Sequence, residues 1–384
     1  MRHKNSVFHD LVKRVPWGVF DRLVDEHAAD RRVRRLPTKS QFLALLYGQL
    51  SGASSLREIV GGLESHAPRL YHAGGRVVQR STLADANALR PSAVFGKLFA
   101  HMAGEAHRGL RRRMAEAVYL IDSSGLRLNA GSEGWARFSA SVCGAKLHVV
   151  YDPDADQPLY AAITPARVND ITAAQQMPIE AGATYVFDLG YYDYGWWARM
   201  HAARCRIVTR LRCFTRLTLS QEREPCQADG ILHDCIGFLP ARQASHRKNP
   251  FAAQVREIHV RTDDGRLLRL VTNDLAAPAT EIAALYKRRW AIELFFRWIK
   301  QTLRIRHFIG TSENAVRIQA FIALIAFMLL RMAQKDQKTV QSPLAFARLV
   351  RTNLMHRKRI DALLPARTDP PDKTDQIAFH WAAS

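Results

Sequence analysis

Two aspartates, Asp122 and Asp188, each stand directly after a short apolar run. Residues 117–121 read Ala-Val-Tyr-Leu-Ile, and residues 184–187 read Thr-Tyr-Val-Phe. Short runs rich in β-branched and aromatic residues predict buried strands. A carboxylate at the end of such a strand lies at the edge of a sheet, where its oxygens can bind a metal ion.

A third carboxylate, Glu293, lies in a helical pattern with the spacing Tyr286-x2-Arg289-x3-Glu293-x6-Lys300. At about 100° per residue, seven residues turn roughly 700°, which brings Tyr286, Glu293 and Lys300 within about 20° of one line. Arg289 lies about 40° from Glu293. The spacing therefore predicts one helix face with an aromatic ring, two cations and a carboxylate.

Three carboxylates far apart in the sequence are the ligands that a two-metal phosphodiester site needs. Mg²⁺ prefers hard oxygen ligands and keeps room for water and phosphate oxygens. Two ions roughly 3.5–4 Å apart can activate a nucleophile and stabilise the leaving oxygen of an in-line displacement. The sequence therefore predicts that Asp122, Asp188 and Glu293 hold two Mg²⁺ ions, with Mn²⁺ as a substitute.

Each of these residues also has an ordinary structural interpretation. An aspartate at a strand end commonly forms a turn or caps a helix. Arg289 and Glu293 have the i,i+4 spacing of an ion pair on a solvated helix. The combination of three acids with this helix pattern favours the metal site over separate structural roles.

The motifs around the three acids resemble those of the DDE transposases of bacterial insertion sequences, of the insertion-sequence-4 type. The signature Y-x2-R-x3-E-x6-K is matched at all four positions. Residues 121–124, Ile-Asp-Ser-Ser, resemble the strand with the family's first aspartate, and residues 187–191, Phe-Asp-Leu-Gly-Tyr, resemble its D-x-G-[YF] motif. With residues 146–148 and 163–170, the resemblance covers roughly residues 115–330.

This resemblance implies a mechanism and partners. It implies nicking at the ends of a mobile element, hairpin ends, and transesterification into target DNA by a homodimer that holds two terminal inverted repeats. Arg289 and Lys300 would clamp phosphates, and Tyr286 would contact a phosphate or sugar. A hairpin requires a base to leave the stack, and Trp290 would brace that base by stacking, unless it packs in the core.

The charge balance independently favours a nucleic-acid enzyme. Lys and Arg number 56 against 35 Asp and Glu, a formal net charge of +21. Such an excess suits a polyanionic partner. Basic residues cluster at residues 31–35, 108–113 and 286–306. One cluster can be a solvated helix face, but several clusters with aromatic residues favour phosphate contacts.

The length of 384 residues predicts more than one domain. Residues 1–114 are predicted to form a helical DNA-binding domain, which resembles the amino-terminal domain of one branch of the transposase family. Residues 336–384 are predicted to form a C-terminal helical segment and tail. Helices are predicted at residues 8–24, 39–50, 55–63 and 82–89. The second and third fit either a helix-turn-helix, whose second helix enters the major groove, or a plain helical bundle.

Residues 115–335 predict an α/β fold with a ribonuclease-H-like catalytic core. Strands are expected at residues 118–128, 136–143 and 146–152, followed by a polar helix and the strand that ends at Asp188. In a ribonuclease-H-like arrangement the first and fourth strands are adjacent, which would bring Asp122 and Asp188 together. Residues 205–268 alternate with period two and predict a β-rich insertion or a separate β domain. A last strand, at residues 267–272, would then lead to the helix with Glu293.

The remaining features predict a cytoplasmic, nucleoid-associated protein without a membrane span. The amino terminus lacks the apolar run of a signal peptide, and residues 320–330 are too short to cross a bilayer, so they predict a buried helix. Cys226, His233 and Cys235 match no standard zinc spacing, so reduced thiols are expected. The acidic run at residues 152–156 predicts a hairpin turn.

Two other functions stay open. A ribonuclease-H-like nuclease without strand transfer would use the same carboxylates but would not need the Tyr, Arg and Lys face. An inactive DNA-binding element protein is the second alternative. The intact acids and signature positions argue against it.

Overall fold

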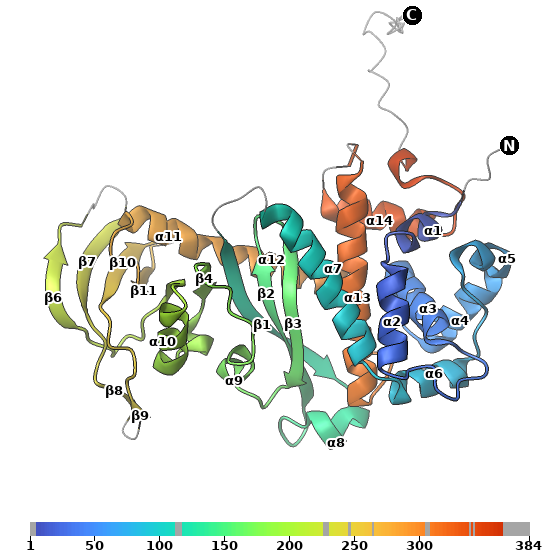
Figure 1. Cartoon of the computed structure of the whole chain (residues 1–384), viewed down its shortest axis with the longest axis horizontal. Coiled ribbons are helices and arrows are strands. Elements are labelled where there is room, and N and C mark those ends of the chain that lie inside the picture. The colour runs from blue at the N-terminus through green and yellow to red at the C-terminus, as the bar shows by residue number, and fades with distance from the viewer. Residues whose placement is uncertain are drawn as a thin grey trace, which may run out of the picture.

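The computed structural model describes residues 5–111, 117–225, 230–244, 247–262, 265–303, 308–337, 339–340 and 342–363. Within these residues the chain has a mixed α/β fold. Helices form one end of an elongated molecule, and a long twisted sheet runs from them to the other end (Figure 1). The N-terminal helices are α1 (Val7–Val12), α2 (Trp17–Glu26), α3 (Thr38–Ser51), α4 (Leu56–Ser65), α5 (Ala67–Leu70), α6 (Arg80–Leu89) and α7 (Ala93–Arg111).

Local sequence explains where these helices begin and end. Pro16 separates α1 from α2, where the sequence predicted one helix over residues 8–24, because proline cannot continue a helix from within. Ser55 caps α4 and accepts a hydrogen bond from the Glu58 N–H at 3.2 Å, as the break before it predicted. The helix α3 is almost wholly buried, including its polar residues Gln41 and Gln49, so it is the centre of this bundle.

Nine strands of the described chain form one sheet, in the order β3-β2-β1-β4-β5-β11-β10-β7-β6. Their bounds are β1 (Val118–Leu128), β2 (Cys143–Asp152), β3 (Gln157–Pro165), β4 (Thr184–Phe187), β5 (Arg206–Arg210), β6 (Thr218–Arg223), β7 (Ile231–Phe238), β10 (Val255–Arg261) and β11 (Leu267–Thr272). A separate ribbon pairs β8 (Arg242–Ala244) with β9 (Arg247–Lys248).

The first half of the sheet confirms the predicted neighbours and corrects two strands. β1 is antiparallel to β2 and parallel to β4, so the first and fourth strands lie side by side as predicted. The strand predicted at residues 136–143 is wrong, because α8 (Glu133–Ala136) and an exposed turn occupy most of it. The missed strand is β3, which forms the predicted hairpin with β2. Pro158 and Pro165 argued against a strand at these residues, because proline lacks the N–H that a sheet needs. They are tolerated because β3 is an edge strand.

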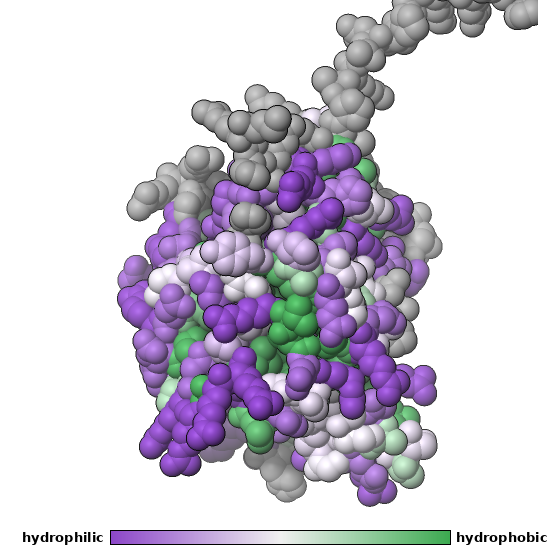
Figure 2. Space-filling model, turned by 90° about the vertical axis from the view of Figure 1, so that its right-hand side faces the viewer, coloured by the Kyte–Doolittle hydropathy of each residue, from purple (hydrophilic) through white to green (hydrophobic). Residues whose placement is uncertain are grey.

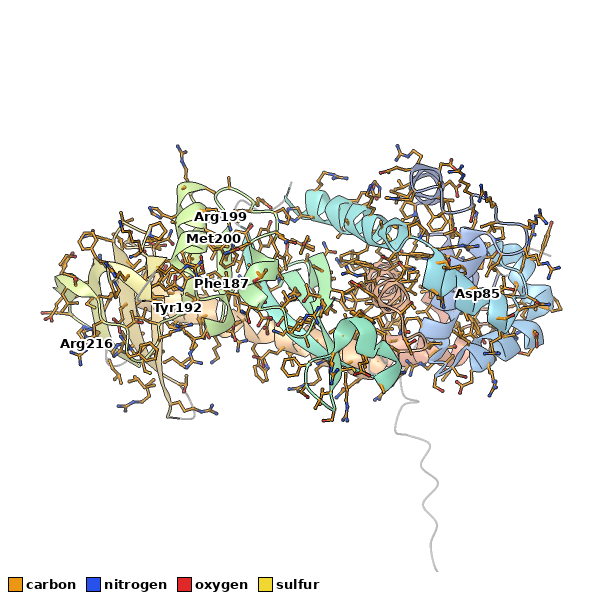
Figure 3. All side chains as sticks on the ribbon, turned by 90° about the horizontal axis from the view of Figure 1, so that it is seen from below. Asp85, Phe187, Tyr192, Arg199, Met200 and Arg216 are labelled. Atoms are coloured by element: carbon orange, nitrogen blue, oxygen red, sulfur yellow. The ribbon has the colours of Figure 1, made fainter. Side chains whose placement is uncertain are left out.

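The second half of the sheet corrects the boundary of the β-rich insertion. The strand beside β4 is β5, which the sequence placed inside the insertion, and β11 lies beyond β5 and antiparallel to it. The strands β10, β7 and β6 then extend the same sheet, so they form no separate layer. Figure 3 shows this extent, with Asp85 of α6 and Arg216 near β6 toward opposite ends of the molecule and Phe187 of β4 between them.

Both faces of the central strands of the sheet are covered, whereas β6 at the far edge is exposed. Neighbouring residues of β1 point into different cores, Leu120 into one and Ile121 into the other. The first core also contains apolar residues of α11 (Ala279–Arg288), α12 (Trp290–Thr302) and α13 (Glu313–Lys335), and the second contains α10 (Tyr194–Ala202), which follows α9 (Asp170–Ala174).

By length and composition α13 could cross a membrane, but 72% of its apolar stretch is buried, and it packs against α3, α6 and α7. This confirms the predicted buried helix at residues 320–330. The last described α-helix, α14 (Pro343–Asn353), packs beside it.

Candidate active site

Asp122 and Asp188 lie next to each other because the neighbouring strands β1 and β4 run parallel and in register. Ile121 pairs with Phe187, and the residue after each is an aspartate, Asp122 within β1 and Asp188 directly after β4. Neighbouring strands lie about 4.8 Å apart. The Asp122 carboxylate accepts the Ser123 N–H at 2.7 Å. Backbone pairing therefore sets the two carboxylates next to each other.

The third carboxylate comes from α12, whose start differs from the prediction. The single helix predicted over residues 286–300 is two helices that meet at Arg289, where the Arg289 N–H donates to the Tyr286 carbonyl at 3.0 Å, an i→i−3 bond. The Arg289 guanidinium donates to the Glu293 carboxylate at 2.5 Å, and its other terminal nitrogen lies 3.7 Å from Asp122. Arg289 therefore links the helix acid to the acid of β1.

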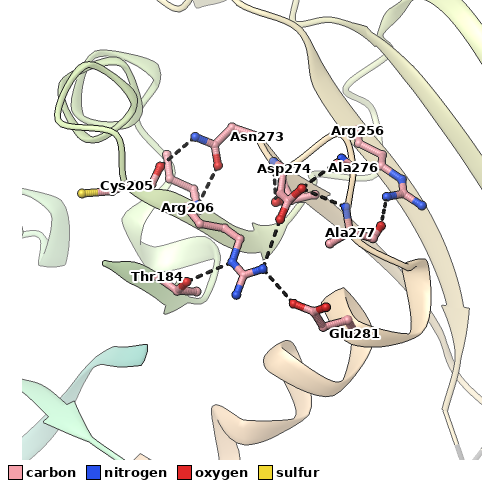
Figure 4. A network of polar contacts seen from close by, with 11 residues as sticks. Thr184, Cys205, Arg206, Arg256, Asn273, Asp274, Ala276, Ala277 and Glu281 are labelled. Atoms are coloured by element: carbon pink, nitrogen blue, oxygen red, sulfur yellow. Dashed lines mark hydrogen bonds and ion pairs between the residues drawn. The ribbon is translucent and has the colours of Figure 1, made fainter. Parts of the chain in front are cut away.

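A polar network fixes the start of α11 against the sheet (Figure 4). Arg206 of β5 donates to the Thr184 hydroxyl of β4 at 2.9 Å and pairs with Asp274 at 3.1 Å and Glu281 at 2.8 Å. Asp274 also accepts two backbone N–H groups just before α11, each at 3.0 Å. These bonds tie α11, which leads into the helix that carries Glu293, to β5 and to β4, the strand that leads to Asp188.

The charges of Asp188 and Glu293 both act on Asp122. Burial raises the pKa of Asp122 to about 6, with further upward contributions from Asp188 and Glu293. The Ser123 N–H and the Arg289 guanidinium oppose this rise of the pKa. In the described parts of the chain, however, no three His, Cys, Asp or Glu side chains are grouped closely enough to hold one ion as they stand.

The chemistry of these side chains fits a hard divalent cation. Their ligand atoms are carboxylate oxygens, which Mg²⁺ and Mn²⁺ prefer over thiolate or imidazole. Burial is the main cause of the raised pKa of Asp122, and the charges of Asp188 and Glu293 add to it, so the charged form of this carboxylate lacks compensating positive charge. A divalent ion would supply the missing positive charge, with Asp122, Asp188 and Glu293 as its ligands.

A fourth carboxylate, Asp170 at the start of α9, lies on the other side of β1. Its Oδ1 accepts the Ser123 hydroxyl at 2.9 Å and lies 3.1 Å from the Lys146 ammonium. The fully buried His148 lies 3.7 Å away, and burial lowers the pKa of His148 to about 4. Burial raises the pKa of Tyr191, and the charges of Asp122, Asp170 and Asp188 add to this rise.

Sequence reasoning missed the role of Asp170, although it included residues 146–148 and 163–170 in the resemblance. Asp170 ends no strand and has no helical spacing to another acid. The pairing of Ser123 with His148 across β1 and β2 brings its partners together, and no local pattern shows this pairing. A usable signal was the hydroxyl of Ser123 beside the predicted catalytic Asp122.

Gly190 packs tightly between two of the acids. Its N–H donates to Asp188 Oδ1 at 2.8 Å. A Cβ at this position would lie 3.0 Å from Asp188 Oδ1 and 3.2 Å from Asp170 Oδ2, closer than ordinary contact. A larger residue at this position of the D-x-G motif would therefore push against both carboxylates.

The predicted DNA contacts lie on and beside α12 and differ in exposure. Trp290 is 50% exposed, and the Arg297 guanidinium lies 5.8 Å from its ring centroid, so Trp290 is not a core residue. Lys300 is half-buried in the last turn of α12. Tyr286 is only 8% exposed and packs beside Arg289, so a direct contact of its ring with DNA needs a local rearrangement.

Two sequence features fall on parts of the chain that the structure does not describe. Arg112 and Arg113 of the basic cluster at residues 108–113 lie outside the described residues, and so does Cys226. Cys235, on β7, is buried, and burial raises the pKa of its thiol to about 11.

Comparison with known proteins agrees with the motifs of the site. The family profile of the transposase DDE domain matches residues 113–329, and a domain family of unknown function matches residues 3–76. A Sinorhizobium fredii (strain NBRC 101917 / NGR234) protein, provisionally named transposase y4zB, is 40% identical over 83% of this chain and 88% of its own length. A Geobacillus stearothermophilus protein, named as the probable transposase for insertion sequence element IS5377, is 30% identical over 68% of this chain and 69% of its own.

Among solved structures, the piggyBac transposase synaptic complex with hairpin DNA aligns with a TM-score of 0.47 and 12% sequence identity. The alignment covers 96% of this chain and 87% of that chain. A likeness at this TM-score is too weak to establish a shared fold.

Proposed function

This chain belongs to the DDE transposases of bacterial insertion sequences, and we propose that Asp122, Asp188 and Glu293 form the metal centre with which it cuts and joins DNA. The observation that carries this proposal is the register of the neighbouring strands β1 and β4, which places Asp122 within β1 level with Asp188, directly after β4. Arg289 connects Glu293 to Asp122.

The residues of the chain have separate tasks in this proposal. When bound, two Mg²⁺ or Mn²⁺ ions would activate the attacking water or 3′-hydroxyl and stabilise the leaving 3′-oxygen. Arg289 holds Asp122 and Glu293 in place before DNA arrives and is positioned to pair with a phosphate when the ions neutralise those acids. Lys300 contributes a second phosphate contact. Catalysis then consists of positioning and charge neutralisation, without a covalent protein–DNA intermediate.

The wider arrangement supports the finer parts of the proposal. The order β3-β2-β1-β4-β5, with β1 parallel to β4, is what we expect of a ribonuclease-H-like core. The exposed ring of Trp290, three residues before Glu293 on α12, is suited to stack on a base that leaves the duplex when a hairpin end forms. We further propose that two chains act together on two terminal inverted repeats and a target duplex.

The test is a cleavage assay with DNA that carries the flanking inverted repeats. The wild-type protein should give nicks, hairpins and joined products with Mg²⁺ or Mn²⁺, and Asp122→Asn should give none while still binding the ends. Glu133→Gln is the matched control, because Glu133 forms only a surface ion pair with Arg137. Cleavage by Asp122→Asn at the wild-type rate would refute the site, and nicks without joined products would identify a nuclease without strand transfer.

A further inference from the structure

The segment between α2 and α3 carries four arginines on the surface. We call residues 28–36 the arginine loop; its exposed members are Arg31, Arg32, Arg34 and Arg35. Among the residues that the structure describes, no carboxylate oxygen lies within 4.0 Å of any of these guanidinium groups. Their positive charge is therefore available to an external partner.

Internal bonds hold the arginine loop in one conformation. Asp30 accepts two hydrogen bonds from Thr38, at 2.7 Å from the N–H and 2.6 Å from the hydroxyl. The buried Arg90 donates to the Leu36 carbonyl at the other end of the loop. Arg32 has a left-handed φ of 62°, which residues other than glycine rarely adopt, so the backbone is held against its local preference. An ordered loop loses less conformational entropy on binding than a mobile one.

A groove of about 490 Å³ separates the arginine loop from α6. Among the described residues that line it, Asp85 is the one acid, against Arg31, Arg34 and Arg35 of the loop. Leu89 of α6 lines the groove as well and is 82% exposed. The groove thus has a cationic wall of three arginines, which suits the negative charge of a phosphate backbone. Seen from this end, the molecule shows hydrophilic residues on both sides of an apolar strip (Figure 2).

The helix-turn-helix alternative fits the structure less well. Its first helix, α3, is almost wholly buried. Its second helix, α4, would have to face the DNA, and its exposed charged residues are Arg57, Glu58 and Glu64. Two acids against one base repel a phosphate backbone, so α4 is a poor recognition helix.

We propose that the arginine loop is a docking site for duplex DNA and binds its phosphates outside the candidate active site. The proposal rests on the proposed function, because it takes the element's DNA as the partner. It gives a role to a segment of the domain of unknown function that matches residues 3–76. Phosphate contacts of this kind position the protein on DNA without reading its sequence.

The test compares salt dependence of DNA binding in EDTA, where cleavage does not occur. A triple variant, Arg31→Gln with Arg34→Gln and Arg35→Gln, is measured against wild type by fluorescence anisotropy with a terminal-repeat duplex. Each lost phosphate contact should reduce the slope of log K against log salt by about 0.9, and three contacts by about 2.7. A slope of about 0.9 over the decade of salt concentration from 1 M to 0.1 M corresponds to about an eightfold change in the binding constant. Each phosphate contact should therefore contribute up to about eightfold to the affinity at 0.1 M salt.

Two further variants make the result specific. The control removes three exposed cations of the C-terminal segment, Arg348→Gln, Arg357→Gln and Lys358→Gln, and should keep the wild-type slope. A lysine version of the loop triple should also keep most of the slope, because it retains the charge. Equal slopes for the loop triple and wild type, or equal losses in the loop triple and the control, would overturn the proposal.

The outcome is separable from that of the proposed function. At saturating protein the loop triple should cleave DNA in Mg²⁺ as wild type does, because the loop lies outside the candidate active site. Failure of wild type to cleave would count against the proposed function alone. An unchanged salt slope in a protein that cleaves would count against the loop alone.

Discussion

Replacement of Asp122 by asparagine should stabilise the fold at neutral pH. In the folded protein the pKa of Asp122 is raised to about 6, against about 3.9 for an ordinary aspartate. Ionisation is therefore harder in the folded state than in the unfolded state, by about 2 pKa units or about 3 kcal/mol. Only 18% of this side chain is exposed, so solvent screening reduces the figure little.

The sign of the pH dependence follows from the raised pKa. Between about pH 4 and pH 6 the folded protein holds a proton on Asp122 that the unfolded chain has lost, so the free energy of unfolding falls as pH rises through this window. Below pH 4 the carboxyl is neutral in both states and resembles asparagine. The variant should therefore match wild type near pH 4 and exceed it by about 3 kcal/mol at pH 7.

Thermal unfolding in EDTA at the two pH values measures this difference. With about 2.1 cal/mol/K of unfolding entropy per residue and 384 residues, about 3 kcal/mol corresponds to a rise of roughly 4 °C at pH 7. Other titrating groups are common to both proteins and cancel in the comparison. A variant less stable than wild type at pH 7, or a difference equal at both pH values, would mean that Asp122 is a structural turn or cap residue.

Four other outcomes are expected. Mn²⁺ should raise the unfolding temperature of wild type, by more at higher Mn²⁺ concentration, and should leave the unfolding temperature of Asp122→Asn almost unchanged. Equal rises in both proteins would mean that the ion binds elsewhere. Gly190→Ala should slow cleavage at saturating protein by roughly tenfold or more, because the added Cβ displaces Asp188 by a few tenths of an ångström, and a wild-type rate would contradict this packing argument. Asp170→Asn should cleave faster than Asp170→Ala, since asparagine still accepts the serine hydroxyl; equal rates would mean that Asp170 does not position the site. Trp290→Ala should nick normally but form few hairpins, and Trp290→Phe should restore them. Undiminished hairpin formation by the alanine variant would remove Trp290 from the mechanism.

Much of the local structure could be predicted because it depends on neighbouring residues. β1 covers the predicted residues 118–128. Its apolar run marks the start, and the polar stretch after Leu128 marks the end. Ser55 begins α4 as expected, because an N-cap is a contact over three residues. The buried helix at residues 320–330 followed from continuous apolarity, which only a core position satisfies.

Elements with weak local signals were predicted less well. The run over residues 206–219 reads as one alternating pattern, but only β5 belongs beside β4, and backbone pairing with a distant strand decides this. The break at Arg289 likewise has no proline or glycine to announce it. It places the guanidinium between Asp122 and Glu293, which belong to different elements.

The sequence by itself determined the type of chemistry, because the acids, the Y-x2-R-x3-E-x6-K spacing and the excess of cations are properties of residue identity and order. Tertiary structure decided which side chains act together. Asp170 reaches Ser123, the neighbour of Asp122, through the pairing of β1 with β2, and the arginine loop becomes a DNA-binding candidate because α3 is buried and α4 is acidic on its exposed side. Burial and proximity depend on contacts between residues far apart in the chain, which no local pattern encodes.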